Sequence, residues 1–239
     1  MDRLGQRDGV EVVGFAGGVA LFAGAATLAG LSAEALARAA GEHLARVVGR
    51  SVPVLFARQE HTRLTFTYSA PEPLQPEPHS VGVCDALITA ERGVGLCVRT
   101  ADCLPIVLAG DGAVAVVHGG WRGLAADIIG AALARLRAEL GIEPHGIEAA
   151  IGVGVGPCHY RVGEEVVAAL AHHDAGEADW RVGDRVDLAS WARGRLAALG
   201  VAEARILVLA GCTACSAAYH SHRRDGPRAG RQWNAAILL

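Results

Sequence analysis

The chain contains no lysine, so all 22 of its basic residues are arginine. Arginine stays protonated in proteins and has no amine that can form a Schiff base with a carbonyl substrate. A Walker-type phosphate loop also needs a lysine to reach the bound phosphates. The sequence therefore excludes Schiff-base enzymes and P-loop nucleotidases.

Positive charge is also scarce, because 25 acidic residues leave a net charge of −3. No block of basic residues is present that could neutralise a run of phosphates, so a nucleic acid partner is not expected. Hydrophobic residues make up 51% of the chain and charged residues only 20%. This composition is typical of a globular protein with a substantial core and not of a disordered one.

The chain has few cysteines and no long uninterrupted apolar run. Six cysteines in 239 residues are too dilute for a disulfide scaffold. The longest apolar stretch near the N-terminus, residues 12–31, contains five glycines and has no positively charged leader, so we expect neither a signal peptide nor a membrane span. We therefore expect a cytoplasmic protein without a membrane partner, whose thiols are free, buried or bound to metal.

Length and hydrophobic periodicity predict one domain spanning residues 1–239, with a mixed α/β (α+β) fold. Four prolines between positions 71 and 78 predict a surface loop. The predicted helices are 32–48, 124–140, 164–172 and 187–199. The predicted strands are 54–57, 63–68, 86–89, 95–100, 106–109, 113–118, 147–151, 205–209 and 235–239. Strands outnumber helices about two to one, so we expect packed mixed β-sheets flanked by helices.

The segment 100–124 carries the first chemical signal. Cys103 lies next to one predicted strand, His118 ends the following strand, and Asp111-Gly112 supplies the turn between them. Strands joined in this way are neighbours, so the thiol and the imidazole are expected at one edge. Such a pair serves either as a nucleophile with its base or as two metal ligands.

The residues after His118 add a second signal. In the sequence HGGWRG, two glycines allow the backbone to approach a ligand closely, and Arg122 can pair bidentately with an anion. This combination suits a phosphate group. Trp121 is expected to pack in the core.

Seven motifs occur in the order in which they occur in the laccase-domain family. They are HTRLTFTY at 61–68, CDALIT at 84–89, TADCLP at 100–105, HGGWRG at 118–123, GVGPCHYRVG at 154–163, GCT at 211–213, and SHRRDG followed by GR within 221–231. The chain resembles that family from about residue 52 to its C-terminus. The family's older name is multicopper polyphenol oxidase, and its members are now regarded as zinc-dependent purine nucleoside phosphorylases.

The resemblance implies a zinc ion held by His61, Cys103 and His118. Two imidazoles and one thiolate leave one coordination position open, which is the pattern of a catalytic zinc site. It also implies phosphorolysis of adenosine, inosine, guanosine and 5′-methylthioadenosine to the base and ribose 1-phosphate, with deamination of adenosine as a second activity. A purine nucleoside and phosphate are the expected partners.

The resemblance and the motifs together nominate the remaining site residues. Arg122, and with it Arg223 or Arg224, would offset the negative charge of phosphate. Asp102, next to the thiolate, would orient a ligand histidine or take a proton, or else cap a backbone turn. Two histidines, His159 and His222, are expected to line the substrate pocket.

Three positions depart from the family pattern. The family usually opens with Arg-x-Gly-Gly-Val-Ser near the substrate pocket, whereas this chain has Phe-Ala-Gly-Gly-Val-Ala at 15–20, so a donor is expected to be missing there. Glu60 replaces an apolar residue before the ligand histidine. Arg161 occupies the place of a glutamate. Metal binding is therefore better supported than turnover of the family's usual substrates.

Other histidines and cysteines support alternative functions less well. Cys212 and Cys215 have the spacing of a redox motif or zinc knuckle, but without a second such pair we expect ordinary buried thiols. His220 and His222 form a single His-x-His pair, and a multicopper centre needs many more imidazoles. Laccase activity therefore ranks below phosphorylase activity, although copper could replace zinc at an N/S site.

Two further alternatives remain open from the sequence. Cys103 and His118 could act without metal as the nucleophile and base of a hydrolase, and some relatives are described as peptidoglycan editing factors. The chain could also be a degenerate member that binds nucleosides or a partner without catalysis. The sequence does not indicate an oligomeric state.

Overall fold

Two β-sheets form the centre of the protein in the computed structural model, which describes residues 1–25, 30–70, 74–173, 175 and 180–239. The strands of the seven-stranded sheet are, in order across it, β1 (Asp2–Arg7), β2 (Val10–Phe15), β3 (Gly18–Ala23), β15 (Gln232–Leu238), β8 (Gly95–Thr100), β4 (Val54–Arg58) and β6 (Pro78–Val83). Those of the six-stranded sheet are β14 (Ile206–Val208), β11 (Glu148–Ile151), β9 (Leu104–Gly110), β10 (Ala113–Gly119), β7 (Ala86–Thr89) and β5 (Thr65–Tyr68).

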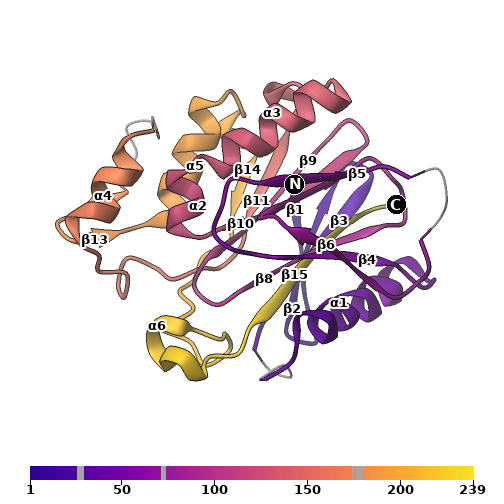
Figure 1. Ribbon diagram of the computed structural model, residues 1–239, viewed down its shortest axis with the longest axis horizontal. Helices are drawn as coiled ribbons and strands as arrows, with labels where there is room; N and C mark the ends of the chain where they lie inside the picture. Colours follow the sequence, from indigo (N-terminus) through magenta and orange to yellow (C-terminus); the bar gives the residue numbers. More distant parts are fainter. Residues whose placement is uncertain (26–29, 71–73, 174, 176–179) are drawn as a thin grey trace.

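Helices cover the outer face of each sheet. They are α1 (Ala33–Val48), α2 (Trp121–Ala125), α3 (Ile128–Leu140), α4 (Glu164–Ala171), α5 (Leu188–Ala198) and α6 (His222–Asp225), and a short ribbon pairs β12 (Arg181–Val182) with β13 (Arg185–Val186). Helix α1 packs on the seven-stranded sheet, while α3 and α5 pack on the other sheet (Figure 1). A third hydrophobic core lies between the two sheets. The predicted fold class, packed mixed sheets flanked by helices, is confirmed.

The helix α1 shows why local sequence predicts this element well. The Ser32 hydroxyl accepts a hydrogen bond from the amide of Ala35 at 3.1 Å, and Gly49 ends the helix at φ +75°. Leu36, Ala40 and Leu44 recur every four residues and are fully buried against the sheet.

The predicted helix 124–140 is wrong in one respect, because the structure breaks it into α2 and α3. Asp127 adopts a left-handed conformation at φ +64°, and its carboxylate caps α3 by accepting the amide of Gly130 at 3.2 Å. A Cβ atom at Gly130 would lie 2.2 Å from that carboxylate, so only glycine permits this cap. The carboxylate also pairs bidentately with Arg195 of α5, at 3.0 and 2.9 Å. A tertiary ion pair therefore fixes a break that local periodicity does not indicate.

The strands β1, β2, β3, β6, β12 and β13 were not expected. The segment 12–31 is rich in glycine and alanine, which have weak strand preferences, yet β3 lies buried between β2 and β15. The strand β6 begins at Pro78 and forms an edge of its sheet, where proline is tolerated. Of the predicted loop 71–78, residues 71–73 lie outside the described part, and residues 74–77 form no helix or strand.

Within the described residues, none of the helices combines the length and the apolar character that crossing a membrane requires.

We expect Asp127→Ala to lower the free energy of unfolding by about 2–3 kcal/mol, because it removes a helix cap and a half-buried ion pair and leaves alanine in a left-handed conformation. Asp127→Asn, which tolerates that conformation and keeps the cap, should cost about 1 kcal/mol. Urea denaturation at pH 7 measures both. The exposed pair of Arg193 and Glu203 gives the control, since Glu203→Gln should change stability by less than about 0.5 kcal/mol.

The effect should also depend on pH. Burial opposes the charge of Asp127, but hydrogen bonds from Arg195 outweigh it and lower the pKa of the carboxyl group. The stabilisation is therefore complete above the unfolded-state pKa of about 4 and is lost as the pH falls through the lower folded-state value. A stability difference between wild type and Asp127→Asn that stays constant down to the acid limit of folding would contradict this assignment.

Candidate metal centre and anion pocket

Two parallel strands bring the first two site residues together. The strands β4 and β8 are parallel neighbours, so the loops that follow them leave the same edge of the seven-stranded sheet. His61 lies in the loop after β4, and Cys103 lies in the loop after β8. The Gln59 side chain fastens these loops, because its amide donates to the carbonyl of Arg99 at 2.8 Å and its oxygen accepts the Arg99 amide at 2.9 Å.

The third residue comes from the other sheet. The strands β9 and β10 form the predicted antiparallel hairpin, and Asp111 and Gly112 both have positive φ in its turn, as a tight hairpin requires. His118 pairs with Pro105 in this register and therefore lies beside Cys103 at the end of the hairpin. The predicted proximity of Cys103 and His118 is confirmed.

The ligand atoms of His61, Cys103 and His118 all lie within 4.8 Å of one another. The Nε2 atom of His61 is 3.6 Å from the Cys103 sulfur, and the two imidazole rings are 4.9 Å apart at an angle of 61°. Zinc–ligand distances of about 2.0–2.1 Å to nitrogen and 2.3 Å to sulfur place neighbouring tetrahedral ligands about 3.5 Å apart. The three side chains therefore fit a metal ion with one remaining position open.

Asp85, just before β7, holds both histidines in place. One of its carboxylate oxygens is 2.8 Å from Nδ1 of His118 and also accepts the amide of His61 at 3.1 Å. The other oxygen accepts the amide and the hydroxyl of Thr62, at 2.7 and 2.8 Å. When Nδ1 donates to this carboxylate, Nε2 of His118 is left free to bind a metal.

These contacts also set the protonation of the site. Burial opposes the charge of Asp85, but hydrogen bonds from His118 and Thr62 outweigh it and lower its pKa to about 2. Burial likewise opposes the Cys103 thiolate, but the charge of His118 lowers the pKa of the thiol to about 6. The Cys103 thiolate and Asp85 together raise the pKa of His118 despite its burial. Without metal, the site therefore favours a thiolate–imidazolium pair.

Gly120 leaves the space that the cluster occupies. A Cβ atom at this position would lie 2.3 Å from the His61 ring and 3.0 Å from the Cys103 sulfur. Its φ of −76° is accessible to any residue, so the requirement for glycine is steric. The close backbone approach that was expected for the glycines of HGGWRG is therefore the approach of Gly120 to the side chains of His61 and Cys103.

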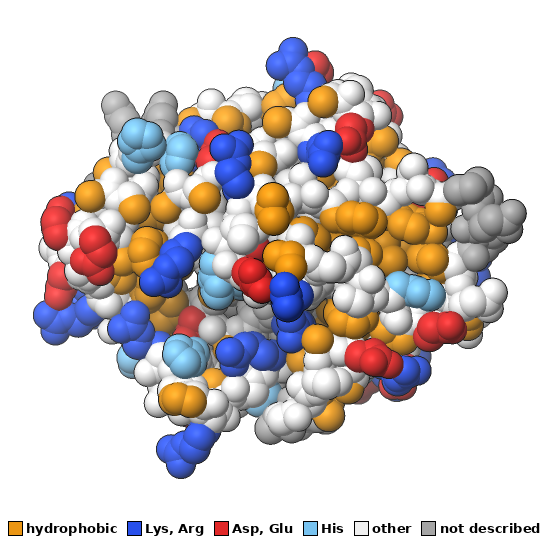
Figure 2. Space-filling model, viewed as in Figure 1, with side chains coloured by type: hydrophobic (Ala, Val, Ile, Leu, Met, Phe, Trp, Pro, Cys, Tyr) orange, Lys and Arg blue, Asp and Glu red, His pale blue; other side chains and the backbone are white. Residues whose placement is uncertain are grey.

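The cluster opens into a cavity of about 780 Å³, visible in Figure 2 as a hollow bordered by arginine and histidine side chains. Residues from both sheets, from α2 and from α6 line it. They are Gln59, His61, Arg99, Thr100, Ala101, Asp102, Cys103, His118, Trp121, Arg122, Val155, Tyr160, Leu188, His222, Arg223 and Arg231.

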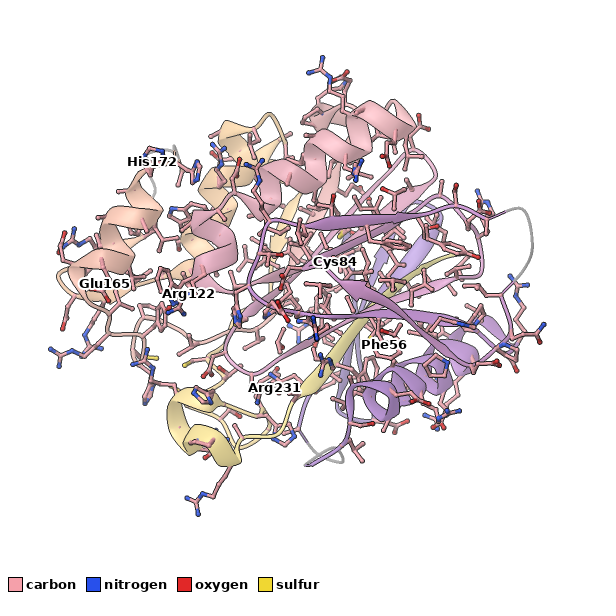
Figure 3. The ribbon with its side chains drawn as sticks, viewed as in Figure 1. Phe56, Cys84, Arg122, Glu165, His172 and Arg231 are labelled. Atoms are coloured by element: carbon pink, nitrogen blue, oxygen red, sulfur yellow. The ribbon has the colours of Figure 1, made fainter. Side chains whose placement is uncertain are left out.

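Four arginines give the cavity its charge. Arg122 comes from α2 and Arg231 from the segment before β15, as Figure 3 shows, and Arg99 and Arg223 complete the set. Arg122 stacks on Trp121, with its guanidinium carbon 4.3 Å from the ring centroid. The Nε–H of Arg99 is buried and has no hydrogen-bond partner in the structure. An unpaired buried donor among converging guanidinium groups favours binding of an anion.

Asp102 organises the loops around the cavity. It adopts φ +88°, and its carboxylate accepts the Thr213 hydroxyl and the Arg223 amide, both at 2.5 Å. Its carbonyl accepts the amide of Val155 at 2.9 Å. These contacts join distant loops and do not cap a local turn, and the carboxylate that contacts the ligand histidine is that of Asp85.

Some residues nominated from the sequence lie outside the cavity lining. Arg224 donates to the carbonyls of Thr213, Ser216 and Tyr219 and holds that loop together. His159 is exposed and lies among cysteine sulfurs.

The position of three cysteines corrects another expectation. Cys158 and Cys215 are exposed and Cys212 is half-buried, so Cys212 and Cys215 are not ordinary buried thiols. His220, in contrast, is buried and packs against Gly230, while His222 lines the cavity. The His-x-His pair is therefore divided between two environments.

The departures from the family pattern also lie away from the cavity lining. Residues 15–20 span the turn between β2 and β3, where the carbonyl of Gly17 accepts the amide of Leu239. The exposed side chain of Glu60 pairs with Arg58, and that of Arg161 pairs with Asp184. The segment in which a donor was expected to be missing therefore does not line this cavity.

Sequence reasoning missed several residues of the site. Asp85 stands in an otherwise apolar strand region, and a buried acidic residue there is the signal that could have identified it. Arg99, Arg231 and Tyr160 reach the cavity only through tertiary packing. Tyr160 and Arg231 stand within the motifs GVGPCHYRVG and GR, and Arg99 directly precedes TADCLP, so these motifs are the signal that could have indicated them.

Comparisons with known proteins agree with the resemblance. A family model described as multi-copper polyphenol oxidoreductase laccase matches residues 32–239. A purine nucleoside phosphorylase of Xylella fastidiosa is 41% identical over 159 residues, which cover 62% of this chain and 58% of that protein. One of Streptomyces coelicolor is 37% identical over 189 residues, covering 75% and 74%. A protein named adenosine deaminase, from an unknown prokaryotic organism, is 36% identical over 62% of this chain and 59% of its own length.

The fold is shared with solved structures as well. The crystal structure of YlmD from Geobacillus stearothermophilus superposes with a TM-score of 0.85 at 28% identity and covers 99% of both chains. The chain spans less than two thirds of the length of the curated Xylella and Deinococcus relatives that it matches.

We expect Gly120→Ala to weaken metal binding at the His61–Cys103–His118 cluster at least about tenfold, because the added methyl group displaces the His61 ring. Competition with a chromogenic chelator measures the zinc affinity. Cys103→Ala, which lacks one ligand of this cluster, shows the signal that remains without it. Gly146→Ala is the matched control, since a Cβ atom there meets nothing within 4 Å. Wild-type affinity in Gly120→Ala would show that the cluster does not bind the metal.

Asp85→Asn should weaken the same metal binding by about 10–100-fold, because the histidine ligand loses the carboxylate that orients it. The amide is nearly isosteric, so the variant should still fold, which circular dichroism can verify. The same chelator competition applies. Unchanged affinity would exclude Asp85 as the positioning residue.

Proposed function

Since the chain belongs to the multi-copper polyphenol oxidoreductase laccase family, we propose that it is a zinc-dependent purine nucleoside phosphorylase. One observation supports this most strongly: a two-histidine, one-cysteine ligand set opens into a cavity lined by four arginines. Phosphorolysis needs a site for inorganic phosphate beside a nucleoside, and relatives that are 41% and 37% identical are named purine nucleoside phosphorylases.

In this proposal His61, Cys103 and His118 hold the metal, and Asp85 positions the two histidines. A divalent cation in this place supplies Lewis-acid polarisation of a phosphate or water oxygen. Two imidazoles with a thiolate suit zinc, and copper is the competing ion at such a site. The cavity lining provides this one small ligand set, which is too few for a multicopper oxidase centre.

The arginines of the cavity would bind phosphate. Arg122 is oriented by its stacking on Trp121, and the buried Nε–H of Arg99, which has no partner in the structure, is a donor that an anion could satisfy. Arg223 is positioned through its amide by Asp102, and Arg231 also lines the cavity. In the reaction, a phosphate oxygen bonds to C1′ of the ribose as the bond to the base nitrogen breaks, and the base leaves with a proton.

The remaining lining residues would hold the nucleoside. Val155, Tyr160 and Leu188 present apolar surface suited to a purine or a ribose, and His222 adds a polar group at the rim. His159 and Arg224 are not part of this proposed substrate site, because they lie outside the cavity lining.

Adenosine deamination is the second candidate, because one relative carries the name adenosine deaminase. The same metal would then activate water instead of phosphate. The two reactions give different products from adenosine: adenine and ribose 1-phosphate in one case, inosine and ammonia in the other.

The test is a phosphate-dependent assay of adenine release from adenosine, with metal content measured on the same samples. We expect turnover in the wild type, and loss of turnover together with one zinc equivalent in Cys103→Ala. Arg122→Gln should keep the zinc but raise the KM for phosphate about 10–100-fold, since it removes a charge-assisted contact. Arg135→Gln on the exposed face of α3 is the control and should leave both parameters unchanged.

Three results would contradict the proposal. Full phosphorolysis by Cys103→Ala would exclude the metal centre from the reaction. Inosine formation without any phosphate dependence would identify the deaminase instead. Activity in zinc-free protein that thiol alkylation abolishes would support the cysteine hydrolase.

A further inference from the structure

A second group of metal-ligand side chains lies outside the cavity lining. It consists of Cys158, His159, Cys212 and Cys215, called here the thiol cluster, and its four ligand atoms lie within 4.8 Å of one another. The first two residues belong to the loop before α4, and the other two belong to the loop between β14 and α6. Figure 3 shows sulfur atoms between α4 and α6 in this region.

The distances within the thiol cluster are close to those between the ligands of one tetrahedral metal ion. Nδ1 of His159 is 3.4 Å from the sulfurs of Cys158 and Cys215 and 3.8 Å from that of Cys212. The sulfurs of Cys158 and Cys215 are 3.4 Å apart. Tetrahedral zinc places sulfur and nitrogen ligands about 3.5 Å apart and two sulfur ligands about 3.8 Å apart.

The four side chains have the residue types of a structural zinc site, and one pair of them has its usual spacing. Cys212 and Cys215 form a Cys-x-x-Cys pair, and the adjacent residues Cys158 and His159 supply the other two ligands. The backbone amide of Gly156 donates to the Cys212 sulfur at 3.1 Å, a contact that stabilises a thiolate ligand. We propose that the thiol cluster is a second, structural zinc site with three sulfur ligands and one nitrogen ligand.

Solvent exposure argues against a merely packed group of thiols. Cys158 and Cys215 are exposed, so burial of apolar surface gives no reason for the sulfurs to gather there. A disulfide between Cys158 and Cys215 would leave Cys212 and His159 without a role, although the imidazole nitrogen is close to all three sulfurs. A metal ion accounts for all four positions.

The site would fasten two loops that shape the cavity. The loop of Cys158 continues to Tyr160, which lines the cavity, and the loop of Cys212 continues to Thr213. Thr213 donates through its hydroxyl to Asp102, and its amide donates to the carbonyl of Gly154. Because four protein ligands complete the coordination, the metal has no open position and its role is structural.

The experiment compares zinc content and zinc X-ray absorption in four full-length proteins, purified under reducing conditions without chelator and loaded with zinc before excess metal is removed. We expect about two zinc ions per chain in the wild type, and about one each in Cys103→Ala and in the double variant Cys158→Ser/Cys215→Ser. The control Cys97→Ala, which removes a core thiol that belongs to neither cluster, should retain about two.

The sulfur coordination identifies which site is lost. The average number of sulfur ligands per zinc should be about two in the wild type, about three in Cys103→Ala and about one in the double variant. A wild-type average of about one, or unchanged zinc content in the double variant, would overturn the proposal. So would an intact mass two hydrogens lower with a mapped Cys158–Cys215 disulfide.

These outcomes separate this proposal from that of the phosphorylase. The number of sulfur ligands per zinc in the wild-type X-ray absorption spectrum tests the second zinc site even if a variant does not fold. Inactivity toward nucleosides, in turn, does not change the number of sulfur ligands around zinc.

Discussion

The candidate metal centre depends on one buried carboxylate, that of Asp85. It accepts hydrogen bonds from the backbone of residues 60–62 and from the ring of His118, so it fixes the two histidines that come from opposite sheets. His61 is held in a left-handed conformation at φ +59°, a conformation that only surrounding contacts can maintain. A buried charge of this kind is costly unless fully hydrogen-bonded, and here each oxygen has at least two donors.

The topology explains why the ligands converge at one edge. Parallel pairing of β4 with β8 directs two loops to the same side of one sheet, and the β9–β10 hairpin returns His118 beside the start of β9. The strand β7, paired with β10, places Asp85 next to that histidine. The centre therefore lies where both sheets end together, and Gly120 gives the backbone the clearance to pass close by. Each strand or loop positions one ligand side chain, and the packing of the two sheets brings these side chains together.

Much of this arrangement was predictable from the sequence, and the exceptions have physical causes. The pairing of Cys103 with His118 followed from strand, turn and strand, because an Asp-Gly turn fixes the hairpin register. The break between α2 and α3 could not be predicted from the local sequence, because it depends on the ion pair of Asp127 with Arg195, which is distant in the chain. The cluster of three cysteines and His159 was also missed, since two loops about 55 residues apart had to be placed side by side.

Asp102 connects the loops that carry the two metal-ligand groups. It lies next to Cys103 in the chain, and its carboxylate and carbonyl hold Thr213, Arg223 and Val155. The loop segments 154–160 and 211–215 that carry the thiol cluster are thus the same segments that Asp102 fastens to the cavity. One ligand set has a single thiol and lies in the cavity lined by the arginines, and the other has three sulfurs and a histidine and would complete the coordination of a proposed structural zinc. The two sets suit different tasks. A metal that takes part in a reaction needs an open coordination position, whereas a metal that stiffens the cavity wall needs four protein ligands.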